Sequence, residues 1–224
     1  QLRALSSAQV EALRTGQIAA LETADLAALT TNQLRAFGSD DIAALSTDQI
    51  VALGTAQVAS LTTAQLAGLG SAQLAAMETA DLRALSTATL RSLTDAQLDG
   101  LDTAQLQALS TAQIAALTTG QVAGLDTAGI EALTSDQIRA LTSAQVAALG
   151  TAQLAAIETG DVAQLSTAGL RALDSEQLGA FGSDQIGALT TAQVAALTTL
   201  QISQLGTDDL TALEVTMLRN LLHY

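Results

Sequence analysis

The sequence predicts an all-α solenoid in which each eight-residue repeat forms one short helix of about six residues. Three observations predict it: an unbroken octad repeat, a small polar residue at the first position of every octad, and two aliphatic positions that need a shared interior. Aligned on Ser7, 26 octads run without insertion to Glu214. We therefore expect a truncated leading octad at 1–6, a repeat solenoid at 7–214 and a C-terminal cap at 215–224.

The first position of each octad is Ser or Thr, except for Asp95. Each of these three residue types has a short side chain whose oxygen can accept a hydrogen bond from a free backbone N–H at a helix start. The pattern predicts that the first residue of each octad is the N-cap of a helix. The predicted N-caps include Ser7, Thr15, Thr23, Thr31, Ser39, Thr47, Asp95 and Ser183.

The third position is Gln in 18 octads and Asp in five. An acid there suits the positive end of a helix, and Gln can bond a neighbouring backbone group. The fourth position is always Leu, Ile or Val, and the seventh is Leu except at Phe37, Met77, Ile157 and Phe181. We expect the fourth and seventh positions to form the core.

The fifth position varies freely, which predicts a solvent-exposed face. If the solenoid binds a partner, arginines at this position are the candidate surface contacts. They are Arg35, Arg83, Arg91, Arg139 and Arg171.

A single long helix does not fit the repeat. Eight residues advance about 800° at 3.6 residues per turn, so the apolar pair would rotate by roughly 80° in each octad and form no steady stripe. A β-solenoid is the rival fold, because short repeats with aliphatic ladders also describe it. Ala, Gln and Leu favour helix, however, and alternation with period two is missing.

The octad rule fails at the C-terminus, where Val215 occupies the first position. Leu218, Leu221 and Leu222 follow, and no cap or turn residue interrupts them. This pattern predicts a longer helix from Asp208 to Leu222 that covers the end of the stack. The chain begins at Gln1 and shows no signal peptide, so we expect it to be a segment of a longer protein.

Composition excludes several functions. The net charge of −14, with only eight basic residues, opposes binding to nucleic acid or to anionic lipid. No apolar run approaches the roughly 18 residues of a membrane span. The chain has no Cys, and its single His is the penultimate residue, His223, so we expect no catalytic site, no metal ligand set and no cofactor. The acidic spots at Asp40–Asp41, Asp184 and Asp208–Asp209 could bind Ca²⁺ weakly, but that ion needs about six to eight oxygens on a shaped loop and a one-residue turn offers few. We interpret these residues as first-turn carboxylates that complement helix dipoles.

The octads resemble a known repeat type. Runs such as LTTAQVAALTTLQ (189–201) and LSTAQIAALTTGQVAGL (109–125) are similar to octapeptide arrays in very large, acidic bacterial proteins described as adhesin-like, haemagglutinin-like or haem-utilisation proteins. The resemblance covers the chain up to Glu214 and implies a secreted or surface location in a Gram-negative bacterium. We do not extend the haem-binding function to this chain, because it shows no suitable axial ligand residues.

Two functions follow as expectations. The first is a non-catalytic spacer, stalk or scaffold within a large secreted or surface protein. The alternative is an adhesive binding module, whose surface or groove holds a peptide, a glycan or a second repeat array. Self-association or a protein or glycan partner fits either function, and the repeat itself names no partner.

Overall fold

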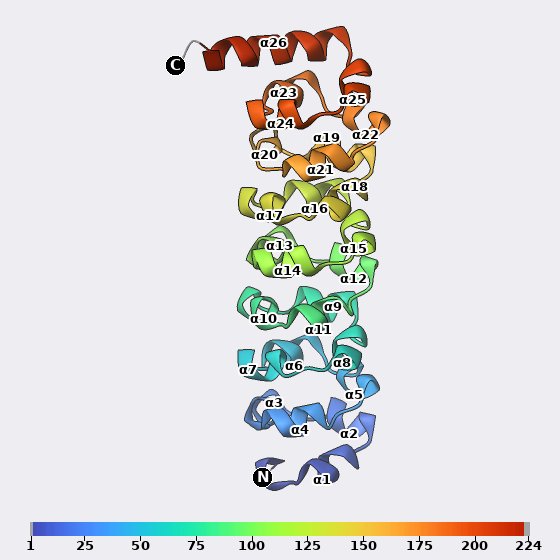
Figure 1. Cartoon of the computed structure of the whole chain (residues 1–224). Helices are drawn as coiled ribbons and strands as arrows, with labels where there is room; N and C mark the ends of the chain where they lie inside the picture. Colours follow the sequence, from blue (N-terminus) through green and yellow to red (C-terminus); the bar gives the residue numbers. More distant parts are fainter. Residues whose placement is uncertain (1, 222–224) are drawn as a thin grey trace. The chain divides into compact units, whose positions relative to one another are not determined.

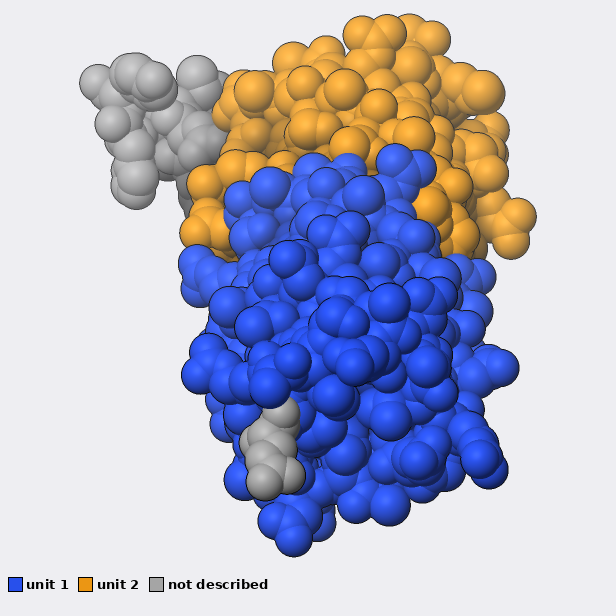
Figure 2. Space-filling view, turned by 90° about the horizontal axis from the view of Figure 1, so that it is seen from below, with its two compact units in different colours: residues 1–117 blue, residues 118–224 orange. Residues whose placement is uncertain are grey.

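The computed structural model describes residues 2–221, with the backbone alone for residues 215–221. Those residues form helices and no strand, which confirms the predicted all-α repeat solenoid. The chain divides into two compact units, residues 1–117 (unit 1) and residues 118–224 (unit 2), coloured blue and orange in Figure 2. The uniform repeat gives no sign of this division.

Unit 1 holds one 3-10 helix and fourteen α-helices among its described residues (Figure 1). They are η1 (Leu2–Ala4), α1 (Ser7–Glu11), α2 (Thr15–Ala19), α3 (Thr23–Ala28), α4 (Thr31–Arg35), α5 (Ser39–Ala43), α6 (Thr47–Val51), α7 (Thr55–Ala59), α8 (Thr63–Ala67), α9 (Ser71–Ala75), α10 (Thr79–Ala84), α11 (Thr87–Leu90), α12 (Asp95–Asp99), α13 (Thr103–Ala108) and α14 (Thr111–Ala116).

Unit 2 continues the same pattern with one helix in each octad. Its helices are α15 (Thr119–Ala123), α16 (Thr127–Glu131), α17 (Ser135–Ala140), α18 (Ser143–Ala147), α19 (Thr151–Ala156), α20 (Thr159–Val162), α21 (Thr167–Ala172), α22 (Ser175–Gly179), α23 (Ser183–Gly187), α24 (Thr191–Ala196), α25 (Thr199–Ser203) and α26 (Thr207–Leu221).

The N-cap prediction is wrong by one residue. Each helix begins at the first position of its octad, and the N-cap is the preceding eighth residue, which has extended backbone. Before α4, for example, Thr30 has φ −73° and ψ 157°, and its Oγ1 accepts the N–H of Gln33. The residues predicted as caps are therefore the first helical residues, and this correction applies to Ser7, Thr15, Thr23, Thr31, Ser39, Thr47, Asp95 and Ser183.

The physical reason for the shift is the spacing to the third position. A cap side chain reaches the backbone N–H of the residue two or three places later, and a Gln three places after the cap can answer by accepting the cap's own N–H. If the N-cap is the eighth residue of the preceding octad, the Gln of the next octad lies three residues after it. If the N-cap is the first residue of the octad, the Gln lies only two residues after it.

The fourth and seventh positions form the core, as predicted. Leu66 is fully buried and Leu69 is 2% exposed, and most fourth and seventh residues of both units are buried in the same way. The exceptions lie in the first two and the last three octads. They are the half-buried Leu13, Leu21, Val194, Leu197 and Ile202, and Leu210, which is 40% exposed. Each helix contacts the helix three places along the chain, as in the pairs α4–α7 and α7–α10 in unit 1 and α18–α21 in unit 2. Because a helix of four to six residues is unstable alone, this stacking is what holds each octad in place.

The last helix, α26, is 15 residues long and contacts α23 and α24. A longer closing helix is therefore present, and it begins at Thr207, one residue before the predicted start. Its role as a cap stays a prediction, and residues 222–224 of the predicted cap lie outside the described residues. Within the described part of the chain, no helix combines the length and apolar character that crossing a bilayer requires.

Candidate functional site

The third-position Gln links each octad to an earlier part of the chain. In unit 1, Gln65 accepts the N–H of Thr62 through Oε1 (2.9 Å). Its Nε2 donates to the carbonyl oxygens of Leu34 (2.9 Å) and Phe37 (2.8 Å), which lie 31 and 28 residues earlier. We call this arrangement an interturn glutamine bridge. One side chain therefore accepts a hydrogen bond from a backbone N–H at its own helix start and donates to backbone carbonyls near the end of an earlier helix.

The bridge recurs with the same offsets in both units. Glutamines that donate to carbonyls 28 and 31 residues earlier include Gln57, Gln105, Gln113, Gln153, Gln185, Gln193 and Gln201. Offsets of 28 to 31 residues correspond to between three and four octads, which sets one superhelical turn within each unit. The sequence predicted that Gln bonds a neighbouring backbone group, and it did not indicate the contact with the preceding turn.

The five candidate arginines are all exposed, as the fifth position predicts. Arg139 forms an ion pair with Asp136 (3.3 Å) and hydrogen-bonds Gln164. Both side chains of the ion pair are largely solvent-accessible, so the pair adds little to stability. The arginines do not gather into one described site, and a role in binding stays a prediction for Arg35, Arg83, Arg91, Arg139 and Arg171.

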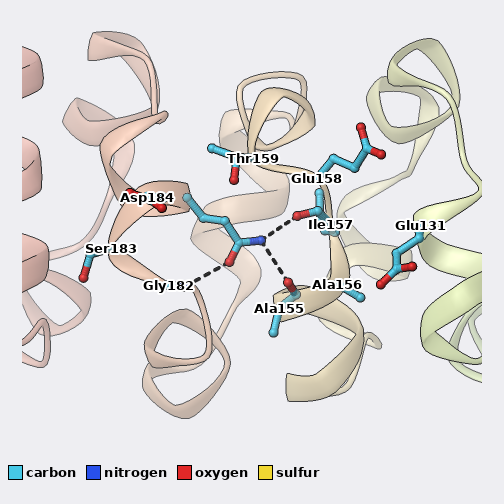
Figure 3. Close-up of a pocket in the computed structure, with 10 residues that line it drawn as sticks. Glu131, Ala155, Ala156, Ile157, Glu158, Thr159, Gly182, Ser183 and Asp184 are labelled. Atoms are coloured by element: carbon cyan, nitrogen blue, oxygen red, sulfur yellow. Dashed lines mark hydrogen bonds between the residues drawn. The ribbon is translucent and has the colours of Figure 1, made fainter.

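A hollow of about 550 Å³ lies within unit 2, between parts of α16, α19, α20 and α23 (Figure 3). Carboxylates of Glu131, Glu158 and Asp184 line it, with the hydroxyl-bearing residues Thr159 and Ser183. Behind them, Gln185 forms a glutamine bridge to Ile157 O (2.7 Å) and accepts from Gly182 N (2.9 Å). The lining of the hollow is therefore acidic and rich in hydrogen-bond acceptors.

The chemistry of this hollow suits recognition of a cationic or donor-rich group. Its ten lining residues include no His, Lys or Arg, so the charges in the lining are all negative. Among the described residues, no three or more His, Asp or Glu side chains gather as metal ligands. We regard the hollow as the candidate binding site of unit 2.

The comparisons with known proteins agree with the fold. The ALTTAQ repeat model matches residues 1–23, 18–55, 51–77, 74–111, 98–127, 122–156 and 154–191. Together the seven matches cover most of the chain as a tandem array. The search of curated proteins returned no match.

Proposed function

Since the chain belongs to the ALTTAQ repeat family, we propose that it is a structural repeat region that acts as a spacer or scaffold in a larger protein. The observation that supports this function is the interturn glutamine bridge. It recurs with the same 28- and 31-residue offsets in both units, so each superhelical turn depends on its neighbours and on no unique set of residues. Solenoids built in this way can gain or lose turns without a change of fold.

The location and the absence of catalysis belong to the same proposal. Resemblance to octapeptide arrays of large bacterial adhesin-like proteins supports a secreted or cell-surface location in a Gram-negative bacterium. The charge of −14 supports solubility of an apolar-rich array, because like-charged copies repel. A spacer needs no reactive group, so we propose a non-catalytic role.

The spacer function is tested by changing the number of octads. The chain has no Cys, so introduced cysteines at the exposed positions Glu11 and Ala115 of unit 1 can carry a fluorescent donor and acceptor. We expect that a second copy of residues 47–78, inserted after residue 78, lowers the energy transfer by one discrete step. The helical content per residue, measured by circular dichroism, should stay unchanged.

A Gly/Ser insertion of equal length at the same place is the control, because it adds residues without glutamine bridges. It should broaden the distribution of transfer efficiencies instead of shifting it. Loss of helix on adding the octads, or an unchanged transfer efficiency, would contradict the spacer function.

A binding module is the second candidate, and the acidic hollow of unit 2 supports it. Its carboxylates at Glu131, Glu158 and Asp184 favour a Lys- or Arg-rich peptide segment over a neutral glycan or a second acidic array. We expect a basic peptide to bind more weakly as salt rises, and binding to disappear in the triple variant E131Q/E158Q/D184N. Equal binding by the variant would exclude the hollow as the site.

A further inference from the structure

One buried carboxylate lacks the partners that other octads provide. Asp81 is the third residue of α10 and is 2% exposed, and its Oδ1 has no hydrogen-bond partner. Across the described residues, no other buried side-chain nitrogen or oxygen is left in that state. A buried carboxylate without a donor or a counter-charge is costly, so the site requires a partner.

Two other octads with Asp at the third position show what a satisfied carboxylate looks like. Asp41 accepts from Gly38 N (2.9 Å) and from Thr15 Oγ1 (2.7 Å), which lies 26 residues earlier. Asp209 accepts from Gly206 N (3.3 Å) and from Ser183 Oγ (2.9 Å), again 26 residues earlier. In both octads, the carboxylate has one donor at its own helix start and one from the preceding superhelical turn.

Asp81 accepts a hydrogen bond neither from the backbone at its own helix start nor from a hydroxyl of the preceding turn. The N-cap of α10 is Glu78, and neither a side-chain cap bond nor a capping box is formed there. The hydroxyl 26 residues earlier belongs to Thr55, and it makes no hydrogen bond to Asp81 in the described structure. The start of α10 therefore presents two acidic residues, one exposed and one buried, without the donors found at Asp41.

The preceding superhelical turn contributes further acceptors. In a glutamine bridge, the amide Nε2 donates to carbonyls 28 and 31 residues earlier, as Gln73 does to Leu45 (2.7 Å) and Ile42 (3.1 Å). The same offsets from Asp81 lead to Leu53 and Ile50, at the C-terminal end of α6. An ionised Asp has no N–H to donate, so the octad of Asp81 offers no side-chain amide to the carbonyl oxygens at these two offsets.

We propose that Asp81 and the carbonyl oxygens of Ile50 and Leu53 form a binding site for Ca²⁺. Carboxylate and carbonyl oxygens are the ligands that this ion prefers, and its flexible coordination lets waters and the Glu78 carboxylate complete the shell. A second acid at Glu78 favours a divalent over a monovalent ion. The site combines one buried carboxylate with main-chain oxygens, so it needs no cluster of three acidic side chains.

The Glu-Thr-x-Asp motif of Asp81 occurs twice more, as Glu22-Thr23-Ala24-Asp25 in unit 1 and as Glu158-Thr159-Gly160-Asp161 in unit 2. The helices that follow, α3 and α20, likewise have no side-chain cap bond. Asp25 is only half-buried and Asp161 is 7% exposed, and neither has a fully buried oxygen without a hydrogen-bond partner. We therefore assign a Ca²⁺ site to Asp81 alone.

Calcium binding is tested by titrating chelator-treated protein with CaCl₂ in an isothermal calorimeter and by melting it with and without Ca²⁺. We expect one site per chain and a melting midpoint that rises with Ca²⁺ concentration, because a ligand of the native state stabilises it. The informative variant is Asp81→Gln, which restores the most frequent residue of that position. It should remove the site, and it should melt at the same temperature with and without Ca²⁺.

The matched control is Asp41→Asn, since the Asp41 carboxylate is already satisfied by an N–H and an O–H donor. It should keep the calcium site. Equal binding by the wild type and D81Q would mean diffuse attraction to the acidic surface and would overturn the proposal. Absence of any calcium-dependent rise in the wild type would overturn it as well.

Discussion

The first octad of unit 1 and an interior octad of the same unit have the same residues at the second, third and seventh positions but differ in burial. Octads 7–14 and 63–70 both carry Gln at the third position and Leu at the seventh. Gln9 is exposed and Leu13 is only half-buried, whereas Gln65 and Leu69 are each 2% exposed. The fourth position is fully buried in both octads.

The difference shows which contacts an octad receives from the preceding superhelical turn. Gln9 accepts the N–H of Ser6 (2.9 Å), as Gln65 accepts that of Thr62, so the bond at the helix start is local. Within the described residues, the side-chain hydrogen bonds of Gln9 are to Ser6 alone, and none joins it to another turn. The octad sequence therefore fixes the helix, while the neighbouring turn buries the third and seventh positions.

The largest expected contrast is at the seventh position. Leu69→Ala should lower the free energy of unfolding by about 3 kcal/mol, because it leaves a cavity in a packed interior. Leu13→Ala should cost less than about 1.5 kcal/mol, since its side chain keeps part of its contact with water. Urea unfolding followed by circular dichroism measures both. Equal losses would mean that the preceding turn contributes little to burial.

A smaller contrast is expected at the third position. Gln65→Ala removes the acceptor of the Thr62 N–H and the donor to two carbonyls, so we expect a loss of about 2 kcal/mol. Gln9→Ala removes the local bond alone, at an exposed place, and should cost below about 1 kcal/mol. The same urea titration separates the two variants, and a larger loss at Gln9 than at Gln65 would refute the bridge as a source of stability.

Sequence reasoning recovered the parts of the fold that depend on single octads. The invariant aliphatic fourth position and the nearly invariant Leu at the seventh predicted the core, and the eight-residue period predicted one short helix per octad. The cap was placed one residue late, although a signal was present: Ser46, Thr62 and Ser110 each precede a Gln by three residues, which is the spacing of a capping box.

The interturn contacts could not be predicted in the same way. The partners of Gln65 lie 28 and 31 residues earlier, and that offset depends on the number of octads in a superhelical turn, which the repeat does not encode visibly. Asp81 resembles the other third-position acids in sequence, and it differs from Asp41 in bonding neither a donor at its own helix start nor a donor from the preceding turn. The acidic hollow likewise combines octads that are distant in the chain.

The smallest contrast tests the position of the cap itself, on two neighbouring threonines. Thr62 Oγ1 accepts the N–H of Gln65 (3.2 Å), so Thr62→Ala should cost about 1 kcal/mol. Thr63 is the first residue of α8 and is exposed, so Thr63→Ala should change stability by less than about 0.5 kcal/mol. The two variants remove the same atoms one residue apart, which makes each the control for the other. A greater loss at Thr63 would mean that the N-cap is the first residue of the octad. Gln65 would then not belong to a capping box, because only Thr62 lies three residues before it.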